Sequence, residues 1–573
     1  MKNIFSFIAC ILVCIVLVQY RVTESDMNGK PPLKVTVWDA FGYYAYLPAI
    51  CIYHDCTQLN WLSEADKKYH VTGGNGWQAE KADNGKYVFK YLGGVAIMEL
   101  PFFYVGDFIA KHYNYPPDGF SPPYQYALGF GVIFYCVLAI LLLRKILLVY
   151  FKDLTVAITI LMVCLATNFI QYVAVDNGQS HGYIFPLYVL VLFTTLKWHQ
   201  NPKVIWAILT GYIIGLATIS RPTEAIMLFI PLMWNTHTKD AANAKWQLVK
   251  QNRPHIAMAA LGGFIGILPQ LIYWKYSSGS FLYDVGSKWD FLNPHFRVLF
   301  GWEKGWFIYT PVTLFFIIGM FFMKGFSFRK SVLWFCLLNI YIIIAWHDWR
   351  YGGSYSTRAL VQSYPVFALP FAALTEKIAL SKWRIPFYLL CAYLLFVNIF
   401  QIKQYCSTVL HYNDMNRRYY RRIYLNPNPS PIDMSLLDSN EVLNDDTHFK
   451  ATTIISADTT MQLHFAANAE DILAVATLNA NAKESWLKVS CSIKAPGYLW
   501  QSYLNAELKE GDSSKHARVR LFNAISKDTA ANQYAFYIRI PQYLQKGELR
   551  LLISSPGSFE GVAEKISIVE LDK

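Results

Sequence analysis

A single carboxylate stands among aromatic residues in the stretch VTVWDAFGYYAYLPAI, residues 35–50. Asp39 is followed at short spacing by Tyr43, Tyr44 and Tyr46. A carboxylate can take a proton from a hydroxyl group or orient that hydroxyl, and aromatic rings offer flat apolar faces on which sugar rings pack. Asp39 is therefore a candidate catalytic base, and the three tyrosines are candidate contacts for a sugar or an acceptor.

Cationic side chains occur in other polar segments, far from Asp39 along the chain. The candidates are Arg221, Arg350, Arg358, His181 and His347. Arginine presents a planar fork that binds phosphate through paired hydrogen bonds, and it keeps its charge. Such a set could bind a phosphate group and stabilise the charge that develops when a bond to it breaks. Glu99 and Tyr355 are further candidate contacts for the sugar or the acceptor.

The chain that must position these residues is strongly apolar. It has 573 residues, of which 54% are hydrophobic and 16% charged. Apolar runs long enough to cross a bilayer recur up to residue 403, so the sequence predicts a mainly α-helical, multi-pass membrane protein with about eleven transmembrane helices. The predicted spans are 4–20, 124–143, 154–173, 182–196, 203–219, 222–236, 256–274, 306–323, 331–346, 359–376 and 385–403.

The beginning of the chain contains two apolar segments that need a separate interpretation. Residues 4–18 lack a following small-residue cleavage site, so we expect a retained first helix instead of a signal peptide. Residues 21–123 then form a long first extracytoplasmic loop. Within it, the apolar stretch 92–110 is interrupted by Glu99 and Asp107. We expect this stretch to lie at the membrane surface, and a full span is the alternative.

The distribution of positive charge orients the predicted helices. The formal net charge is +12, and the lysines and arginines lie mostly between apolar runs. With a cytoplasmic N-terminus, most of them fall in cytoplasmic connections, as expected for a bacterial inner membrane protein. Nothing in this pattern indicates a nucleic-acid partner. The same orientation places Asp39 and the segments 176–181, 220–224 and 347–358 on the outer face. Because charges at membrane depth are costly and usually functional, we expect one extracytoplasmic site there.

The chain becomes polar after the last apolar run. Residues 1–425 are predicted to form the transmembrane catalytic domain, and a proline-rich linker follows at 426–449. Residues 450–573 contain short alternating runs separated by turn signals at intervals of about 8–12 residues, which is typical of an antiparallel β-sandwich. With the chosen orientation, this accessory domain is extracytoplasmic.

Several of these motifs together resemble a known family. WDAFGYYAYLPA is followed by KYLGGVAIMELPFF, DGFSPPYQ, NGQSH, SRPTEA and GGSYSTRALVQSYP, in order, over roughly residues 1–405. Their arrangement is similar to that of the GT-C superfamily of membrane glycosyltransferases, particularly the family 39-like branch of protein O-mannosyltransferases and lipid A glycosyltransferases. The resemblance implies a polyprenyl-phosphate sugar donor, Asp39 as the base and 92–110 as a surface element. Many members have two adjacent acids, whereas Trp38 and Ala40 flank Asp39 here.

The predicted function is therefore an inverting glycosyltransferase. It would move a sugar from a polyprenyl-phosphate donor, among membrane lipids, to a hydroxyl of a glycan, glycolipid or protein acceptor on the extracytoplasmic side. No cofactor is predicted, and the lone Asp39 weighs against a metal ion, although a divalent metal stays open. A flippase or transporter for a lipid-linked glycan is one alternative, disfavoured because transporters usually have repeated halves and sites at the bilayer midplane. A non-enzymatic scaffold of envelope glycan assembly is the other.

Overall fold

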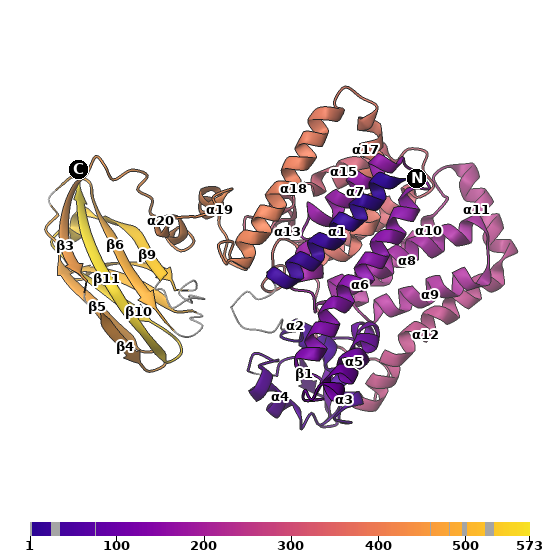
Figure 1. Ribbon diagram of the computed structural model, residues 1–573, viewed down its shortest axis with the longest axis horizontal. Helices are drawn as coiled ribbons and strands as arrows, with labels where there is room; N and C mark the ends of the chain where they lie inside the picture. Colours follow the sequence, from indigo (N-terminus) through magenta and orange to yellow (C-terminus); the bar gives the residue numbers. More distant parts are fainter. Residues whose placement is uncertain are drawn as a thin grey trace. The chain divides into compact units, whose positions relative to one another are not determined.

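The computed structural model describes residues 3–24, 35–74, 76–458, 460–480, 482–495, 501–521 and 532–573. The chain divides into two compact units, Met1–Lys403 and Gln404–Lys573. The first unit is helical, and the second contains two β-sheets (Figure 1). The division falls at 403/404 and not at the predicted 425/426, so residues 404–449 belong to the unit that contains the sheets.

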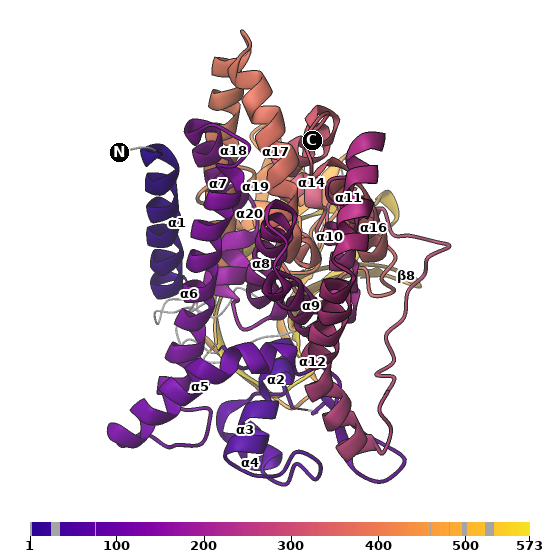
Figure 2. The ribbon, with the colours of Figure 1, turned by 90° about the vertical axis from the view of Figure 1, so that its right-hand side faces the viewer.

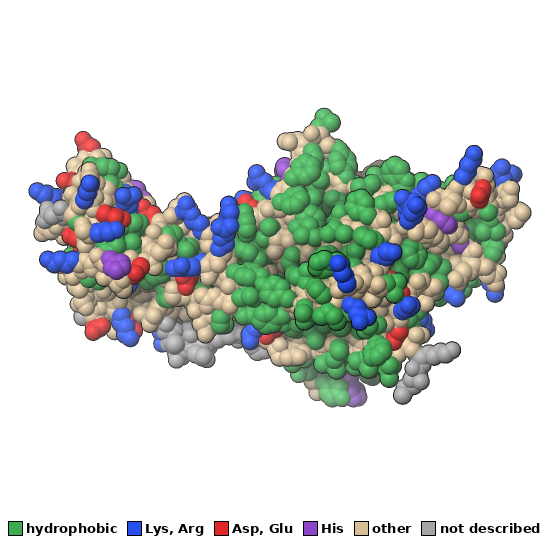
Figure 3. All heavy atoms as spheres, turned by 90° about the horizontal axis from the view of Figure 1, so that it is seen from above, with side chains coloured by type: hydrophobic (Ala, Val, Ile, Leu, Met, Phe, Trp, Pro, Cys, Tyr) green, Lys and Arg blue, Asp and Glu red, His purple; other side chains and the backbone are tan. Residues whose placement is uncertain are grey.

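Four helices in the described chain are long and apolar enough to cross a membrane, judged by length and composition. They are α1 (Ile4–Thr23), α6 (Pro122–Leu147), α12 (Arg253–Ser278) and α18 (Arg384–Cys406). α1 leaves apolar side chains such as Phe5 exposed. Apolar side chains also cover much of the visible face of the helical unit (Figure 3). A water-exposed surface of this kind is unfavourable, whereas contact with lipid suits it. These are the features of an integral membrane protein.

The other predicted spans fall on helices that are shorter, interrupted or less apolar. The regular ones are α7 (Asp153–Leu165), α8 (Ser180–Gln200), α9 (Val204–Thr218), α16 (Arg329–Ile344) and α17 (Tyr364–Ala379). Predicted span 222–236 is divided between the 3₁₀ turn η2 (Pro222–Leu228) and α10 (Phe229–Met233), and 306–323 between α14 (Trp306–Tyr309), α15 (Thr313–Gly319) and η3 (Met320–Phe322). A π-helical turn, η1 (Gln171–Val175), follows α7, and a 3₁₀ turn, η4 (Arg358–Ser363), precedes α17. Helices α11 (Lys239–Gln251) and α13 (Arg297–Phe300) lie between spans.

The first loop folds into a small layer at one end of the long helices (Figure 2). It contains α2 (Asp39–Tyr44), α3 (Tyr46–Cys51), α4 (Leu62–Tyr69), the hairpin β1 (Ala79–Lys81)–β2 (Tyr87–Phe89) and α5 (Gly94–His112). Aromatic rings form its core: Phe41 packs edge-on against Trp61, with ring centroids 6.4 Å apart, and Trp61 stacks on Tyr53 at 4.9 Å. The predicted surface stretch 92–110 is the helix α5, whose Tyr104 and Phe108 are exposed.

Helices α9 and α12 pack closely through glycines. A Cβ atom added to Gly211 would overlap the carbonyl oxygen of Ala259, and one added to Gly262 would overlap that of Ile208. Small residues let helix backbones approach in membranes, where dispersion contacts between helices replace the hydrophobic effect. By contrast, a Cβ atom on Gly263 would lie 3.5 Å from the nearest atom, the carbonyl oxygen of Gly211, which is an ordinary contact.

The C-terminal unit is built from two antiparallel sheets around one core. One sheet has the order β5-β10-β7-β8 and the other β3-β11-β6-β9, with β4 also paired to β11. Alternate residues of β7, Leu504, Ala506 and Leu508, are buried in the same apolar cluster as Ile538 of β9, so the sheets face each other as the alternating runs predict. The strands are β3 (Lys450–Ala457), β4 (Met461–Phe465), β5 (Glu470–Thr477), β6 (Ser485–Lys494), β7 (Tyr503–Glu510), β8 (Ser513–Arg520), β9 (Asn532–Ile540), β10 (Glu548–Ser554) and β11 (Phe559–Asp572), with a 3₁₀ turn η5 (Gln542–Leu544).

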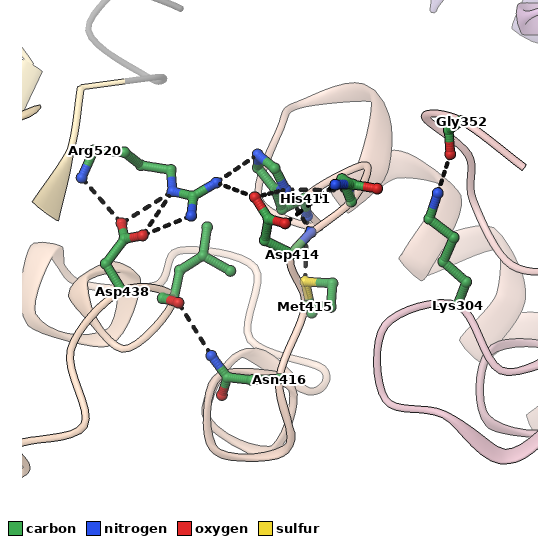
Figure 4. A network of polar contacts seen from close by, with 10 residues as sticks. Lys304, Gly352, His411, Asp414, Met415, Asn416, Asp438 and Arg520 are labelled. Atoms are coloured by element: carbon green, nitrogen blue, oxygen red, sulfur yellow. Dashed lines mark hydrogen bonds and ion pairs between the residues drawn. The ribbon is translucent and has the colours of Figure 1, made fainter. Parts of the chain in front are cut away.

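The segment before the strands is attached to this sandwich by charge. It includes the short helices α19 (Arg417–Ile423) and α20 (Pro431–Ser435). Arg520, at the end of β8, makes a 2.6 Å ion pair with Asp438 and a 2.9 Å ion pair with Asp414 (Figure 4). One arginine therefore fixes two points of the preceding segment on the sheet, which explains why residues 404–449 belong to this unit.

The glycine contact between α9 and α12 gives a test of the fold. Gly211→Ala should lower the free energy of unfolding by about 1–3 kcal/mol, the usual cost of overpacking. Gly263→Ala is the matched control, because its new methyl group has room and alanine favours helix. Thermal unfolding of the two purified variants in one detergent measures the difference. Equal midpoints would contradict a close glycine contact.

Candidate functional site

A cavity of about 610 Å³ in the helical unit collects the predicted polar segments. Asp39, His181, Arg221 and Arg358 all line it. These residues come from the first loop and from three later connections, and Asp39 and Arg358 are separated by 319 positions in the sequence. Tyr43 is also part of the lining. Of the predicted site residues, the fold thus brings one carboxylate, two guanidinium groups and one imidazole to a single cavity, whose lining also includes Asp284, Asp348 and Lys90.

Asp39 is the first residue of α2, and both of its carboxylate oxygens have partners. Trp38 before it adopts a left-handed φ of 56°, which turns the chain into the helix. Oδ2 of Asp39 forms an ion pair of 2.5 Å with Nη2 of Arg358, and Oδ1 accepts a 2.9 Å hydrogen bond from the hydroxyl of Tyr91. Gly42 makes this second contact possible, because a Cβ atom there would overlap the Tyr91 ring. Burial and the Asp39 carboxylate raise the pKa of Tyr91, which keeps the phenol as a donor.

Arg358 begins the 3₁₀ turn η4 and connects Asp39 to a second acid. Its Nη1 donates a 2.8 Å hydrogen bond to Oε1 of Gln179, whose Nε2 donates at 3.0 Å to Asp176. Burial opposes the charge of Arg358, but Asp39, Tyr172 and Asp176 together outweigh it and raise the pKa of this arginine. Burial also raises the pKa of Asp176 to about 6, and the positive charge of Arg358 limits the increase.

Arg221 has a different environment. It precedes Pro222, whose ring starts η2, and its extended backbone directs the chain into the turn. Its Nη1 lies 3.3 Å from Nδ1 of His181. In the described part of the chain, no carboxylate forms an ion pair with Arg221. Glu224, three residues later, instead accepts hydrogen bonds from Tyr188 and Gln362. Arg221 is therefore a cavity cation whose charge is available to an anion.

Aromatic side chains form much of the remaining wall. Trp77, Trp274, Trp289 and Trp346 line the cavity, and the rings of Trp289 and Trp346 pack edge to face at 72° with centroids 4.7 Å apart. The residues after Trp346 form a turn that the buried amine of Lys304 stabilises by donating to the carbonyl oxygens of residues 350 and 352. Figure 4 shows the contact with Gly352. This contact fixes the turn that leads to Arg358.

Six of the predicted site residues do not line the cavity. They are Tyr44, Tyr46, Glu99, Tyr355, Arg350 and His347. Tyr44 and Tyr46 are buried in the aromatic core of the first loop, where their hydroxyls donate to the carbonyl oxygens of Gly119 and Tyr91. Their positions differ from that of Tyr43 because successive residues of a helix point in different directions.

The other four predicted residues are elsewhere for separate reasons. Tyr355 is 1% exposed, and its hydroxyl lies 3.2 Å from Oδ1 of Asn398. Glu99 is buried at 1% exposure on α5, where burial raises its pKa. Arg350 and His347 are exposed, and the guanidinium of Arg350 lies over the ring of Trp349 instead of facing the cavity.

Other residues at the site were not predicted from the sequence. Tyr91 and Gln179 contact Asp39 and Arg358, and Gln362 and Glu224 extend from His181. The available signal was positional: Gln362 and Glu224 are polar residues inside predicted spans, where burial of a polar group is costly unless it is bonded. Tyr91 and Gln179 lie inside motifs that were noted, but neither carries a charge that would distinguish it.

Comparisons with known proteins give weak structural likenesses. No protein-family model and no curated protein sequence matches the chain. The crystal structure of the Archaeoglobus fulgidus oligosaccharyltransferase is 12% identical and covers 74% of this chain and 58% of that one, with a TM-score of 0.43. The cryo-EM structure of arabinosyltransferase EmbB from Mycobacterium smegmatis is 9% identical, covers 97% of this chain and 64% of that one, and has a TM-score of 0.37.

Both of these neighbours are GT-C glycosyltransferases, the superfamily that the sequence motifs resemble. The A. fulgidus enzyme is also known in complex with an inhibitory peptide and a dolichol-phosphate, at 12% identity and a TM-score of 0.43. This chain spans less than two thirds of the length of each neighbour. At these scores the likeness assigns no activity to this chain and no role to any of its residues.

The partly buried Asp176 predicts a pH-dependent stability. Because its pKa is about 6 in the folded protein and ordinarily 3.8, the folded state binds the proton more tightly. Stability should therefore fall as the pH rises from 4 to 6, by about 3 kcal/mol at most. Asp176→Asn should raise the thermal midpoint at pH 7.5 and leave it nearly unchanged at pH 4. An asparagine variant that is less stable at both pH values would contradict the assigned cause.

Proposed function

We propose that this protein is a glycosyltransferase that transfers a sugar from a polyprenyl-phosphate donor to an acceptor hydroxyl at the outer face of a membrane. The observation that carries the proposal is the pairing of Asp39 with Arg358 in the same cavity as Arg221, a cation with no carboxylate partner in the described chain. A carboxylate and a guanidinium without a carboxylate partner, lining one cavity, suit a reaction in which a proton leaves one oxygen while negative charge develops on a phosphate.

The proposed reaction is a single displacement. The acceptor oxygen attacks the anomeric carbon, the bond from that carbon to the phosphate oxygen breaks, and its electron pair leaves with the phosphate. Arg221 binds the phosphate in the donor complex. The phosphate then competes for Arg358, which releases Oδ2 of Asp39 to take the proton of the acceptor hydroxyl. Attack from the face opposite the phosphate inverts the anomeric configuration.

The walls of the cavity support a sugar substrate. Tyr43 and the tryptophans of the lining offer apolar ring faces next to the charged groups, and these faces suit the C–H side of a sugar ring. The described chain contains no cluster of three or more His, Cys, Asp or Glu side chains that could bind a metal ion. The chemistry above is assigned to Asp39, Arg221 and Arg358 because all three line the cavity, as does His181.

The membrane arrangement of the proposal rests on the sequence. We propose that the N-terminus is cytoplasmic, that about eleven helices or interrupted helices cross the bilayer, and that the cavity and the C-terminal sandwich are extracytoplasmic. In a bacterium this corresponds to the periplasmic side of the inner membrane. The acceptor would then be a glycan, a glycolipid or a protein on that side.

Replacement of Asp39 tests the catalytic assignment. Asp39→Asn keeps the shape and one acceptor oxygen but cannot take a proton, so transfer should fall about 10²–10⁴-fold. Mass analysis of envelope glycans and glycolipids, in cells lacking the protein and complemented with each variant, measures the product. Asp83→Asn, an exposed aspartate of the same loop, is the matched control. Full product with correctly inserted Asp39→Asn would remove Asp39 from the mechanism.

Replacement of Arg221 tests phosphate binding separately. Arg221→Gln removes the charge, and Arg221→Lys keeps the charge but loses the planar fork. Binding of polyprenyl phosphate without a sugar should weaken about tenfold or more in the glutamine variant and less in the lysine variant. Titration of the detergent-solubilised protein with this lipid measures the dissociation constant. Unchanged affinity in both variants would place the phosphate elsewhere.

A further inference from the structure

A chain of buried polar groups extends from the cavity on the side of Arg221. Glu224 accepts a 3.1 Å hydrogen bond from Nε2 of Gln362, and Oε1 of Gln362 lies 2.8 Å from Nδ1 of His181. Glu224, Gln362 and His181 are each only 2% exposed. Tyr188 also donates to Glu224, which supplies the carboxylate with a second partner. The displacement mechanism proposed above gives no role to Glu224, Gln362 or Tyr188.

The order of these contacts determines which nitrogen of His181 carries a hydrogen. Glu224 accepts from the hydroxyl of Tyr188 and from Nε2 of Gln362, which is the arrangement of an ionised carboxylate, so Gln362 presents its amide nitrogen to Glu224. Its carbonyl oxygen then faces His181, and an oxygen can only accept. Nδ1 of His181 must therefore be the protonated nitrogen, and in the neutral ring Nε2 carries the lone pair.

The neighbouring arginine favours the neutral ring. Nη1 of Arg221 lies 3.3 Å from Nδ1 of His181. A second positive charge on the imidazole would be repelled there. Nδ1 can satisfy only one of its two contacts, because accepting from Arg221 at 3.3 Å requires a nitrogen without hydrogen and donating to Gln362 at 2.8 Å requires a hydrogen. We assign the hydrogen from the shorter contact, which leaves this donor of Arg221 for a ligand. Nε2 of His181 has no hydrogen-bond partner among the residues that the structure describes.

An acceptor at this position is chemically useful. Arg221 and Arg358 only donate hydrogen bonds. The two carboxylate oxygens of Asp39 already accept from Arg358 and Tyr91, and the carbonyl oxygen of Gln179 accepts from Arg358, while the lining carboxylates Asp284 and Asp348 are on other segments. A sugar hydroxyl that enters beside these donors can accept from them, but its own hydrogen needs an acceptor. A buried polar group without a partner discriminates strongly between ligands that satisfy it and ligands that do not.

We propose that Glu224 is a positioning residue that acts through Gln362 to hold His181 as its Nδ1–H tautomer, so that Nε2 accepts a hydrogen bond from a hydroxyl group of the bound sugar. The tautomer itself does not depend on the proposed function, whereas the sugar contact rests on it. This assigns His181 to recognition of a hydroxyl, a role distinct from phosphate binding.

Nitrogen NMR of the histidine side chains tests the tautomer without any turnover. The full-length protein, labelled with ¹⁵N at histidine and reconstituted in lipid at pH 7, should contain a neutral Nδ1–H signal that disappears in His181→Asn. Glu224→Gln can turn its own amide nitrogen toward Gln362, which then presents nitrogen to His181. The Nε2–H form should therefore appear in that variant. A wild-type Nε2–H or doubly protonated ring, or an identical spectrum for Glu224→Gln, would overturn the proposal.

Two substitutions of His181 test the use of Nε2. Glutamine reaches the position of Nε2 and offers an oxygen there, whereas asparagine reaches only the position of Nδ1. His181→Gln should therefore retain roughly ten- to hundredfold more transfer product than His181→Asn, the range expected for leaving one buried polar group unpaired. The measurement is the envelope-glycan product in complemented cells. Equal loss in both variants, with both proteins inserted and stable, would exclude the sugar contact.

The two sets of results separate this inference from the proposed function. If the product depends on Asp39 but Glu224→Gln leaves the histidine spectrum unchanged, only the positioning role of Glu224 is overturned. The expected tautomer, together with full product in Asp39→Asn, would overturn the proposed mechanism and leave the role of Glu224 in setting the tautomer intact.

Discussion

The ion pair between Asp39 and Arg358 is the constraint on which the rest of the site depends. Neither charge can be buried alone without a large loss of solvation energy, and removal of one partner would leave the other uncompensated. The pair therefore requires the start of α2, in the first loop, to meet the start of η4, which directly precedes α17. Tyr91 and Gln179 satisfy the remaining hydrogen-bonding groups of the pair. The first loop is thus fixed to the helical unit by the same groups that line the cavity.

The two arginines of the cavity are held in related but unequal ways. Arg358 donates to Gln179, which donates to the partly buried Asp176. Arg221 lies 3.3 Å from His181, which Gln362 connects to the buried Glu224. Arg358 also has Asp39, whereas Arg221 has no such carboxylate. This difference makes the two arginines unequal for an incoming anion. The anion can bind Arg221 without displacing a carboxylate, but it must compete with Asp39 for Arg358. A ligand phosphate would therefore be expected to contact Arg221 before Arg358.

The sequence allowed the meeting of distant polar segments to be predicted, because Asp39, Arg221 and Arg358 are charges that a membrane protein can bury only together. It did not distinguish Tyr43 from Tyr44, since both are aromatic and only the rotation of α2 decides which ring reaches the cavity. Charge was also misleading for Arg350, whose side chain remains at the surface. The glutamines could not be recognised, because an uncharged amide is noticed only when its partners on other segments are known. Alternation predicted the C-terminal strands well, since one face of each strand is buried.

The 3₁₀ winding of η4 explains how this short segment contacts both Asp39 and the polar groups beside Arg221. Arg358 and Gln362 are four residues apart within η4, and one contacts Asp39 while the other contacts His181 and Glu224. In an α-helix, residues four apart lie about 40° from each other around the axis and so point to nearly the same place. With three residues per turn, the same separation corresponds to about 120°. The tighter winding directs the two side chains to different partners around one cavity. A regular α-helix starting at Arg358 would bring both side chains to one side and leave one of the two polar chains without its connection.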